Sequence, residues 1–162
     1  MSNKICIFVK DEKIDFNKWK IKKGSEIIGF IAGNFDIIHP GYIKMFKDAK
    51  NVCDWLIVAL HDDPSLEREH KLKPILSLEE RTEILKMLEP VDEVIPYQTE
   101  SDLYNLLSKT GCDVRILGDD YFEKDYTGSD LPIAVYFHKR CRKWSTTLFK
   151  QKIAESLIGF DF

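Results

Sequence analysis

From residue 26 onward, short apolar runs alternate with longer stretches of helical periodicity. The run Glu26–Ala32 (EIIGFIA) is almost continuously apolar, as expected of a strand that is buried on both faces of a parallel sheet. Four later runs of the same kind lie at residues 55–60, 92–96, 113–117 and 133–137. The pattern therefore predicts five strands, most of them parallel.

Helical patterns occupy the stretches between these runs. Residues 42–49 place their apolar side chains on one helical stripe. Ser77 and Glu80 have the spacing of a capping box, which predicts a helix start at this point. Further helices are expected at 101–110 and 145–156. Alternating strands and helices predict an α/β, Rossmann-like, doubly wound sheet of five strands, mostly parallel and covered on both faces.

The first 25 residues follow a different pattern. Two loosely alternating stretches, Ile5–Val9 and Lys13–Ile21, are separated by three polar residues. This pattern predicts a β-hairpin or a pair of edge strands. We therefore divide the chain into an N-terminal extension, residues 1–25, and a main domain, residues 26–162.

Composition narrows the possible partners. The chain carries 24 Lys and Arg against 27 Asp and Glu, and this net charge of −3 argues against general nucleic-acid binding. No apolar run approaches the roughly 20 residues that span a bilayer, and the first residues lack the pattern of a signal peptide. The four cysteines are scattered without metal-binding spacing. We expect a cytoplasmic protein that binds neither nucleic acid nor membrane and supplies no metal site of its own.

The segment Gly33–Tyr42 (GNFDIIHPGY) directly follows the first expected strand. Gly33 lets the backbone turn and lets a ligand approach closely. Pro40 and Gly41 lead into a helix whose N-terminal N–H groups and dipole favour an anion. His39 at the mouth of this helix can donate a hydrogen bond to a phosphate oxygen. Taken alone, a histidine in a loop before a helix is more often an ordinary surface residue, so the segment by itself does not establish a site.

Three more segments at expected strand ends carry polar or charged groups. Ser145–Thr147 opens the last helix and directly follows a basic cluster made of Lys139, Arg140, Arg142 and Lys143. Lys71–Pro74 can hold a second anionic group, and the acids of Gly118–Asp120 can bind a sugar or a base, or contact a metal through water. Each also fits a plainer interpretation, namely an N-cap beside a solvated turn, a charged loop or a strand-end turn. The hypothesis of a phosphate site therefore depends on their combination.

The same segments carry a family resemblance. GNFDIIHPGY is similar to the GTFD…HxGH signature of the HxGH nucleotidyltransferase superfamily, and STT at 145–147 is similar to its ISTT signature. EERTEIL, VDEVIP and VRILGDD occur in the matching order, so the resemblance runs from Ile27 to Glu155. Within the superfamily the chain most resembles the glycerol-3-phosphate cytidylyltransferases. The resemblance implies transfer of CMP from CTP to a phosphomonoester, with Mg²⁺ on the triphosphate and a homodimeric protein.

The resemblance also assigns residues to roles. It places the nucleotide against Gly33, Asn34, Phe35, Asp36, His39, Gly41, Gly118, Asp119, Ser145, Thr146 and Thr147. It assigns catalysis to His39, Tyr42, Lys73, Arg81 and Arg140, and the acceptor to Lys71, Lys73 and Arg81. This requires the turn after the first strand and the start of the last helix to face one triphosphate.

The chain departs from the family at Tyr42, which stands where the motif has its second histidine. A tyrosine cannot become a cation near neutral pH, and its hydroxyl lies farther out than an imidazole nitrogen. Losing one transition-state donor typically costs about 10²–10³ in rate. The positive charge of Arg142 or Lys143 could compensate for the missing histidine. A further departure from the family is Trp144, which replaces an aliphatic residue. The alternatives are another cytidylyl- or adenylyltransferase acting on ethanolamine phosphate or a sugar phosphate, or a catalytically weakened nucleotide-binding protein.

Overall fold

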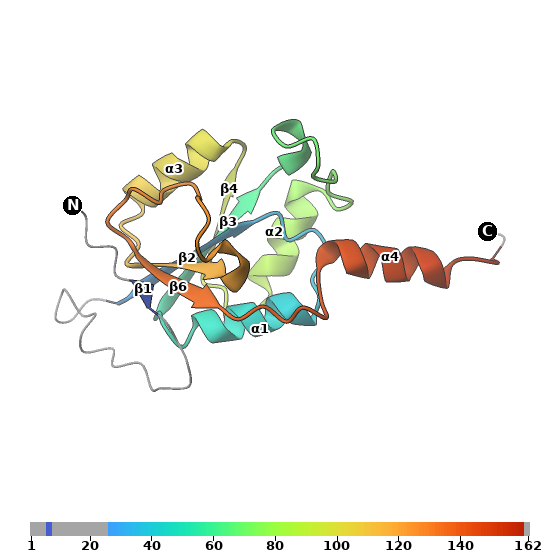
Figure 1. Cartoon of the computed structure of the whole chain (residues 1–162), viewed down its shortest axis with the longest axis horizontal. Helices are drawn as coiled ribbons and strands as arrows, with labels where there is room; N and C mark the ends of the chain where they lie inside the picture. The colour runs from blue at the N-terminus through green and yellow to red at the C-terminus, as the bar shows by residue number, and fades with distance from the viewer. Residues whose placement is uncertain (1–5, 8–25, 161–162) are drawn as a thin grey trace.

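A computed structural model describes residues 6–7 and 26–160 of the chain. Its single sheet has six parallel strands in the order β1-β6-β5-β2-β3-β4 (Figure 1). The strands are β1 (Cys6–Ile7), β2 (Ile28–Gly33), β3 (Trp55–His61), β4 (Glu93–Tyr97), β5 (Val114–Gly118) and β6 (Ala134–His138). The expected α/β sheet is confirmed, and each of the five predicted strands lies within two residues of its predicted bounds.

The sixth strand comes from the N-terminal extension. Residues 6 and 7 pair in parallel with Val135 and Tyr136 of β6, so β1 forms an edge of the sheet. Most of the extension, including the remainder of the expected hairpin, lies outside the described residues. The proposed boundary at residue 25 stays a prediction.

Helices cover both faces of the sheet. They are α1 (Pro40–Ala49), α2 (Leu78–Lys86), α3 (Glu100–Lys109) and α4 (Thr146–Ser156). Side chains of α1 and α2 pack on one face of the sheet, whereas Leu103 and Leu107 of α3 pack on the other. The capping box of Ser77 and Glu80 is present as predicted. Within the described part of the chain, no helix has the length and apolarity needed to cross a membrane.

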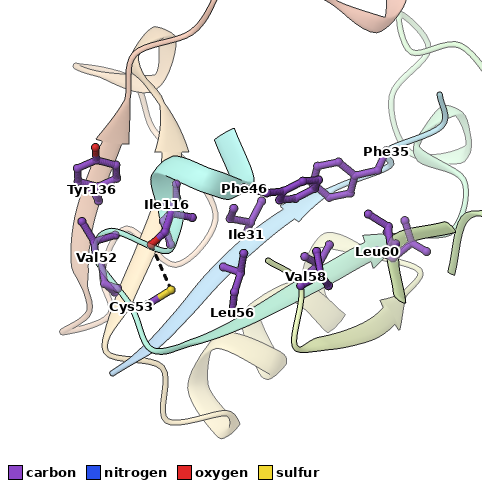
Figure 2. Close-up of a cluster of buried hydrophobic side chains, with 14 residues drawn as sticks. Ile31, Phe35, Phe46, Val52, Cys53, Leu56, Val58, Leu60, Ile116 and Tyr136 are labelled. Atoms are coloured by element: carbon purple, nitrogen blue, oxygen red, sulfur yellow. Dashed lines mark hydrogen bonds between the residues drawn. The ribbon is translucent and has the colours of Figure 1, made fainter. Parts of the chain in front are cut away.

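The core under α1 fixes the position of the strand ends. Ile31 of β2 and Val58 and Leu60 of β3 pack with Phe46 of α1, and all four are at most 2% exposed (Figure 2). Burying one such side chain contributes about 1.5–3 kcal/mol. The Cys53 thiol in this cluster donates to a backbone carbonyl of α1 at 3.2 Å (Figure 2). This packed layer gives the loops at the sheet edge a rigid base.

The carboxyl edge of the sheet borders a cavity of about 720 Å³. The last residue of every strand from β2 to β6 lines it, and these residues are Gly33, His61, Tyr97, Gly118 and His138. Strand β2 lies between β3 and β5: the chain continues from β2 to β3 and β4 on one side and then crosses to β5 and β6 on the other, so the strand order reverses next to β2. Ligands of open α/β sheets bind at such a reversal. Helix α4 projects away from the sheet, and none of its residues is buried (Figure 1).

Candidate active site

The loop after β2 is held in an uncommon conformation. Phe35 has φ of 41°, a left-handed value that costs energy for a residue with a side chain. Its ring is 3% exposed and packs 5.1 Å from the Tyr42 ring and 5.4 Å from the Phe46 ring, centroid to centroid. Burial of this aromatic ring offsets the backbone strain and places Asn34 and Phe35 on the cavity wall.

His39 is the N-cap of α1 and lines the cavity. Its Nδ1 accepts a hydrogen bond from the Gly41 backbone N–H at 3.2 Å, so the proton of the neutral ring resides on Nε2. That Nε2 is buried and has no partner among the described residues. Burial and the nearby Arg140 charge lower the pKa of His39. The ring therefore offers a neutral N–H donor to a ligand at the start of α1.

Gly41 leaves room for this arrangement. A Cβ at this position would lie 2.9 Å from His39 Cε1 and 3.0 Å from Trp144 Cβ. The Trp144 and His39 rings are nearly parallel with centroids 6.0 Å apart. The residue that replaces the family's aliphatic side chain thus packs beside the imidazole, and any larger residue at 41 would push the two rings apart.

Tyr42 connects the two segments that were expected to converge. Its hydroxyl lies 2.7 Å from Thr146 Oγ1 in the first turn of α4, and its ring stacks on His39 with centroids 4.1 Å apart. Burial raises the pKa of Tyr42, so the hydroxyl stays protonated. The hydroxyl extends past the imidazole and joins α1 to α4, which brings both helix N-termini to one cavity.

Both N-termini favour an anion. Neither α1 nor α4 has an acidic residue in its first turn. Ser145 caps α4 by accepting a hydrogen bond from Leu148 N–H at 3.1 Å, and Ser145 and Thr146 line the cavity. Arg140 lines it as well, paired with Asp120 at 2.9 Å. The electrostatics of this region suit phosphate groups.

Asp36 was expected beside the nucleotide, but the structure places it outside the cavity lining. It is 1% exposed, accepts from the backbone N–H groups of Ile75 and Leu76, and pairs with Lys150 of α4 at 2.5 Å. Burial alone would raise the pKa of Asp36, but Lys150 and the two amides outweigh it and lower the pKa. Asp36 therefore anchors α4 to the loop after β2.

Arg81 is likewise turned toward the protein and away from the cavity lining. It is 2% exposed, and its guanidinium donates to the carbonyls of Asn34, His61 and Asp62 at 2.6–2.9 Å. These carbonyls belong to the loop after β2 and to the end of β3 with the residue that follows it. The buried guanidinium of Arg81 thus holds two cavity loops together. A contact between Arg81 and a phosphate group stays a prediction.

The remaining predicted residues divide between the cavity and its surroundings. Gly33, Asn34, Phe35, Gly41, Lys71 and Gly118 line the cavity. Lys73, Asp119 and Thr147 do not, and Asp119 instead accepts from the Arg140 backbone N–H at 3.3 Å. Arg142 and Lys143 are exposed and also lie outside the lining, so neither stands in for the missing histidine in this structure.

Comparison with known proteins decides the family. A model described as cytidylyltransferase-like matches residues 30–154. This chain belongs to that family. It is therefore a nucleotidyltransferase, and the β2 loop and the α4 N-terminus both lie within the matched region.

Curated relatives of this cytidylyltransferase-like chain include larger proteins. The bifunctional protein HldE of Wolinella succinogenes is 36% identical over 140 residues, which cover 86% of this chain and 29% of that protein. HldE of Hyphomonas neptunium is 37% identical over 105 residues, 64% of this chain and 21% of the relative. The chain thus spans less than a third of either HldE. The FAD synthase of Ferroglobus placidus is 36% identical over 101 residues, 62% of this chain and 64% of that enzyme.

A solved structure supports the fold. The lipopolysaccharide core biosynthesis protein from Thermoplasma volcanium GSS1 superposes with a TM-score of 0.60 at 22% identity. The alignment covers 72% of this chain and 98% of that one. At this level of identity, the likeness concerns the fold of the cytidylyltransferase-like domain alone.

Several residues on the cavity wall have no counterpart among the predicted site residues. Arg68, whose guanidinium pairs with Glu100, lies on the side of β3 and β4, where His61 and Tyr97 stack 4.6 Å apart. His138 lies at the end of β6. None belongs to a recognisable motif. Their common signal is position, because three of them end a strand, and every strand end from β2 to β6 faces the cavity.

The cavity of this cytidylyltransferase-like chain holds carboxylates but no clustered metal site. Among residues 6–7 and 26–160, no group of three or more His, Cys, Asp and Glu side chains is arranged to hold a metal ion. Asp120 and Asp125 nevertheless line the cavity. Mg²⁺ bound mainly through phosphates needs only one or two protein carboxylates, so the residues present fit Mg²⁺ that arrives on a triphosphate.

Proposed function

We propose that this nucleotidyltransferase transfers CMP from CTP to a phosphomonoester, with glycerol 3-phosphate as the acceptor, and releases pyrophosphate. The observation that carries the proposal is the 2.7 Å contact between Tyr42 and Thr146. It joins the N-terminus of α1, with the unpartnered Nε2 of His39, to the N-terminus of α4. Two helix N-termini and one buried donor around a single space are suited to a triphosphate.

In this arrangement His39 donates its Nε2–H to an oxygen of the α-phosphate. An oxygen of the acceptor phosphate attacks the α-phosphorus, a new P–O bond forms, and the bond from the α-phosphorus to the β-phosphate oxygen breaks. The leaving pyrophosphate takes that electron pair and stays against Ser145, Thr146 and the α4 dipole. No covalent enzyme intermediate is needed, because positioning and charge stabilisation supply the catalysis.

Magnesium supplies charge neutralisation on the phosphates when it arrives with the nucleotide. The chain's own groups do the rest of the positioning. Asp36 and Arg81 fix the loops, Arg140 adds a cation beside the nucleotide, and the aromatic layer of Tyr42 and Trp144 covers the His39 ring.

The acceptor phosphate is assigned to the side of the cavity formed by the loop after β3. Arg68, His70 and Lys71 line this side and supply donors for an anionic group. The opposite side, at β5 and β6, is left for the nucleoside. In-line transfer requires the acceptor oxygen to approach the α-phosphorus from the side opposite the leaving pyrophosphate, so the acceptor phosphate must lie on the side away from the α4 N-terminus.

Adenylyl transfer is the second candidate, and the likeness to a relative named FAD synthase favours it. Ethanolamine phosphate and sugar phosphates are the corresponding alternative acceptors. These candidates share the proposed phosphate site between the N-termini of α1 and α4, which we call the phosphate cradle. They differ in the base of the nucleotide and in the group that the acceptor phosphate carries.

The test is pyrophosphate release from CTP, ATP, GTP or UTP with Mg²⁺, each combined with glycerol 3-phosphate, ethanolamine phosphate or a sugar phosphate. We expect turnover with CTP and glycerol 3-phosphate, and faster turnover by Tyr42→His. Lys86→Gln, at the far end of α2, serves as the matched control. Nucleotide binding without pyrophosphate release by either the native chain or Tyr42→His would contradict catalysis and leave a binding protein.

A further inference from the structure

His138 is a buried polar residue on the cavity wall that the proposed reaction does not use. It ends β6, is 6% exposed, and lies in register with Gly118 at the end of β5. Its Nδ1 is 2.6 Å from Asp48 Oδ2 of α1, and the Tyr136 hydroxyl donates to the same oxygen at 2.9 Å. Its other ring nitrogen, Nε2, has no hydrogen-bond partner among the described residues. One ring nitrogen is therefore fixed by the protein and the other is left to a ligand.

The Asp48 carboxylate determines which nitrogen carries the proton. Burial by itself would raise the pKa of Asp48, but the hydrogen bonds from His138 and Tyr136 outweigh it and lower the pKa. An ionised carboxylate can only accept, so the shared proton resides on His138 Nδ1. In the neutral ring, Nε2 then presents a lone pair and acts as an acceptor.

The position of His138 relative to the phosphate cradle fits a nucleobase. Tyr42 of α1 lies at the phosphate cradle, and Asp48 of α1 lies at His138. Six residues of helix separate Tyr42 from Asp48, which is about 9 Å along the helix axis. Between these points Met45, Ile31 and Ile116 form an apolar wall of the same cavity. A ribose and a flat ring extending from the α-phosphate along this wall bring the edge of the base to His138.

We propose that His138 selects the base by accepting a hydrogen bond from an exocyclic amino group. Cytosine and adenine carry this donor, whereas uracil and hypoxanthine present a carbonyl oxygen at the corresponding place. Two acceptors facing each other repel, so the carbonyl bases are disfavoured. The proposal rests on the proposed function, because it takes the triphosphate to lie at His39 and Thr146.

A purely structural role, in which His138 only ties β6 to α1, makes a different prediction. It would affect stability and lower the affinity for all nucleotides by a similar factor. Nucleotide pairs that differ only at the amino group separate the two roles, namely CTP against UTP and ATP against ITP.

The experiment measures dissociation constants of these four nucleotides with Mg²⁺ by calorimetry, for the native chain and for His138→Asn. The asparagine amide retains a donor toward Asp48 but places nothing where Nε2 was. We expect the native chain to prefer CTP over UTP and ATP over ITP by about three- to tenfold, and His138→Asn to lose that preference. Lys44→Asn, an exposed change on α1, controls for surface effects and should keep the preference.

His138→Gln supplies a second measurement if the asparagine variant folds poorly. Its side chain reaches the place of Nε2 and can present either an oxygen or an amide N–H, so the preference should vanish through tighter binding of UTP and ITP. An unchanged preference in a folded variant, or equal loss for all four nucleotides, would overturn the proposal. A native chain that binds all four equally would also overturn it and leave the proposed reaction standing, whereas binding none of them would contradict the proposed reaction.

Discussion

The four α-helices in the described part of the chain begin in two different ways. Helices α2 and α3 each open with a capping box in which the protein's own carboxylate, Glu80 or Asp102, binds back to the N-cap backbone. Helices α1 and α4 carry no acid in the first turn, and their caps, His39 and Ser145, each accept one backbone N–H. The first pair satisfies its helix dipoles internally, while the second pair leaves them for an external anion.

This difference separates structural helix starts from binding ones. A capping box occurs in sequences of any function, since it stabilises the helix itself. A helix N-terminus is available to an external anion when its first turn contains no acid and it lines a cavity. A buried unpartnered donor beside it adds a further contact for the anion. The contrast between α1 and α4 on one side and α2 and α3 on the other therefore supports the proposed position of the triphosphate.

The largest effect is expected from removing the anchor that holds the α4 N-terminus beside that of α1. Asp36→Ala leaves Lys150 and two backbone amides without their carboxylate, which for a buried pair costs about 3–5 kcal/mol of unfolding free energy. Denaturant unfolding measures this loss. Lys150→Met, which removes the less buried partner at 16% exposure, should cost less, and equal losses would contradict the role of Asp36 as the centre of the network.

His39→Ala removes the donor at the α1 N-terminus. If the two open N-termini hold the reacting phosphates, turnover should fall by about 10²–10³ while nucleotide affinity changes little, because the contact strengthens in the transition state. Initial rates of pyrophosphate release measure it. A similar fall in Ser77→Ala, at the closed N-terminus of α2, would remove the distinction between the two kinds of helix start.

Thr147→Glu gives α4 the acid that α2 and α3 already have. The new carboxylate in the first turn should stabilise the free protein by about 0.3–1 kcal/mol. It should also weaken triphosphate binding by about fivefold, from repulsion of about 1 kcal/mol at close range in water. Titration calorimetry with CTP measures the affinity. Gln151→Glu adds the same charge one turn farther along α4 and should have a much smaller effect on binding.

Ser77→Ala opens the capping box of α2. Loss of an N-cap hydroxyl costs about 1 kcal/mol of unfolding free energy, and nucleotide affinity should not change. Thermal unfolding with and without CTP separates the loss of stability from any change in nucleotide affinity. A drop in affinity at unchanged loop structure would show that α2 contributes to phosphate binding after all.

The smallest effect concerns pH. Because the pKa of His39 is lowered by burial and by Arg140, folding favours the neutral ring. The corresponding stability is fully present above the ordinary histidine pKa of about 6.5 and is lost as pH falls through the lowered pKa. The difference in unfolding free energy between the native chain and His39→Gln should therefore shrink from pH 7 toward pH 5. A constant difference would mean that His39 is not held neutral.

The fold was largely predictable because its strands are buried on both faces. Continuous apolar runs mark β2 to β6 to within two residues, and Ser77 and Ser145 mark helix starts through side-chain chemistry that acts within four residues. The pairing of β1 with β6 was less accessible. It joins residues about 130 positions apart, and short alternating stretches do not specify which edge they join.

The site was predictable where a motif is local and not where a partner is distant. The segment around His39 and the start of α4 do meet, as the sequence suggested. The charges of Asp36 and Arg81 were visible in the sequence, but their partners lie on other elements, so sequence alone could not tell an anchor from a ligand contact. The sequence also could not show which ring nitrogen of His138 is held by the protein, because its partner Asp48 lies 90 residues away.

The projecting position of α4 has a consequence for the free enzyme. No residue of α4 is buried, and the described contacts that tie it to the domain lie in its first two turns, at Thr146, Phe149, Lys150 and Lys152. Amide hydrogens in its last turns should therefore exchange with solvent faster than those of α1. A nucleotide bound to Ser145 and Thr146 would slow amide exchange at the N-terminal end of α4. Protection from exchange would then decrease along the helix toward its C-terminus.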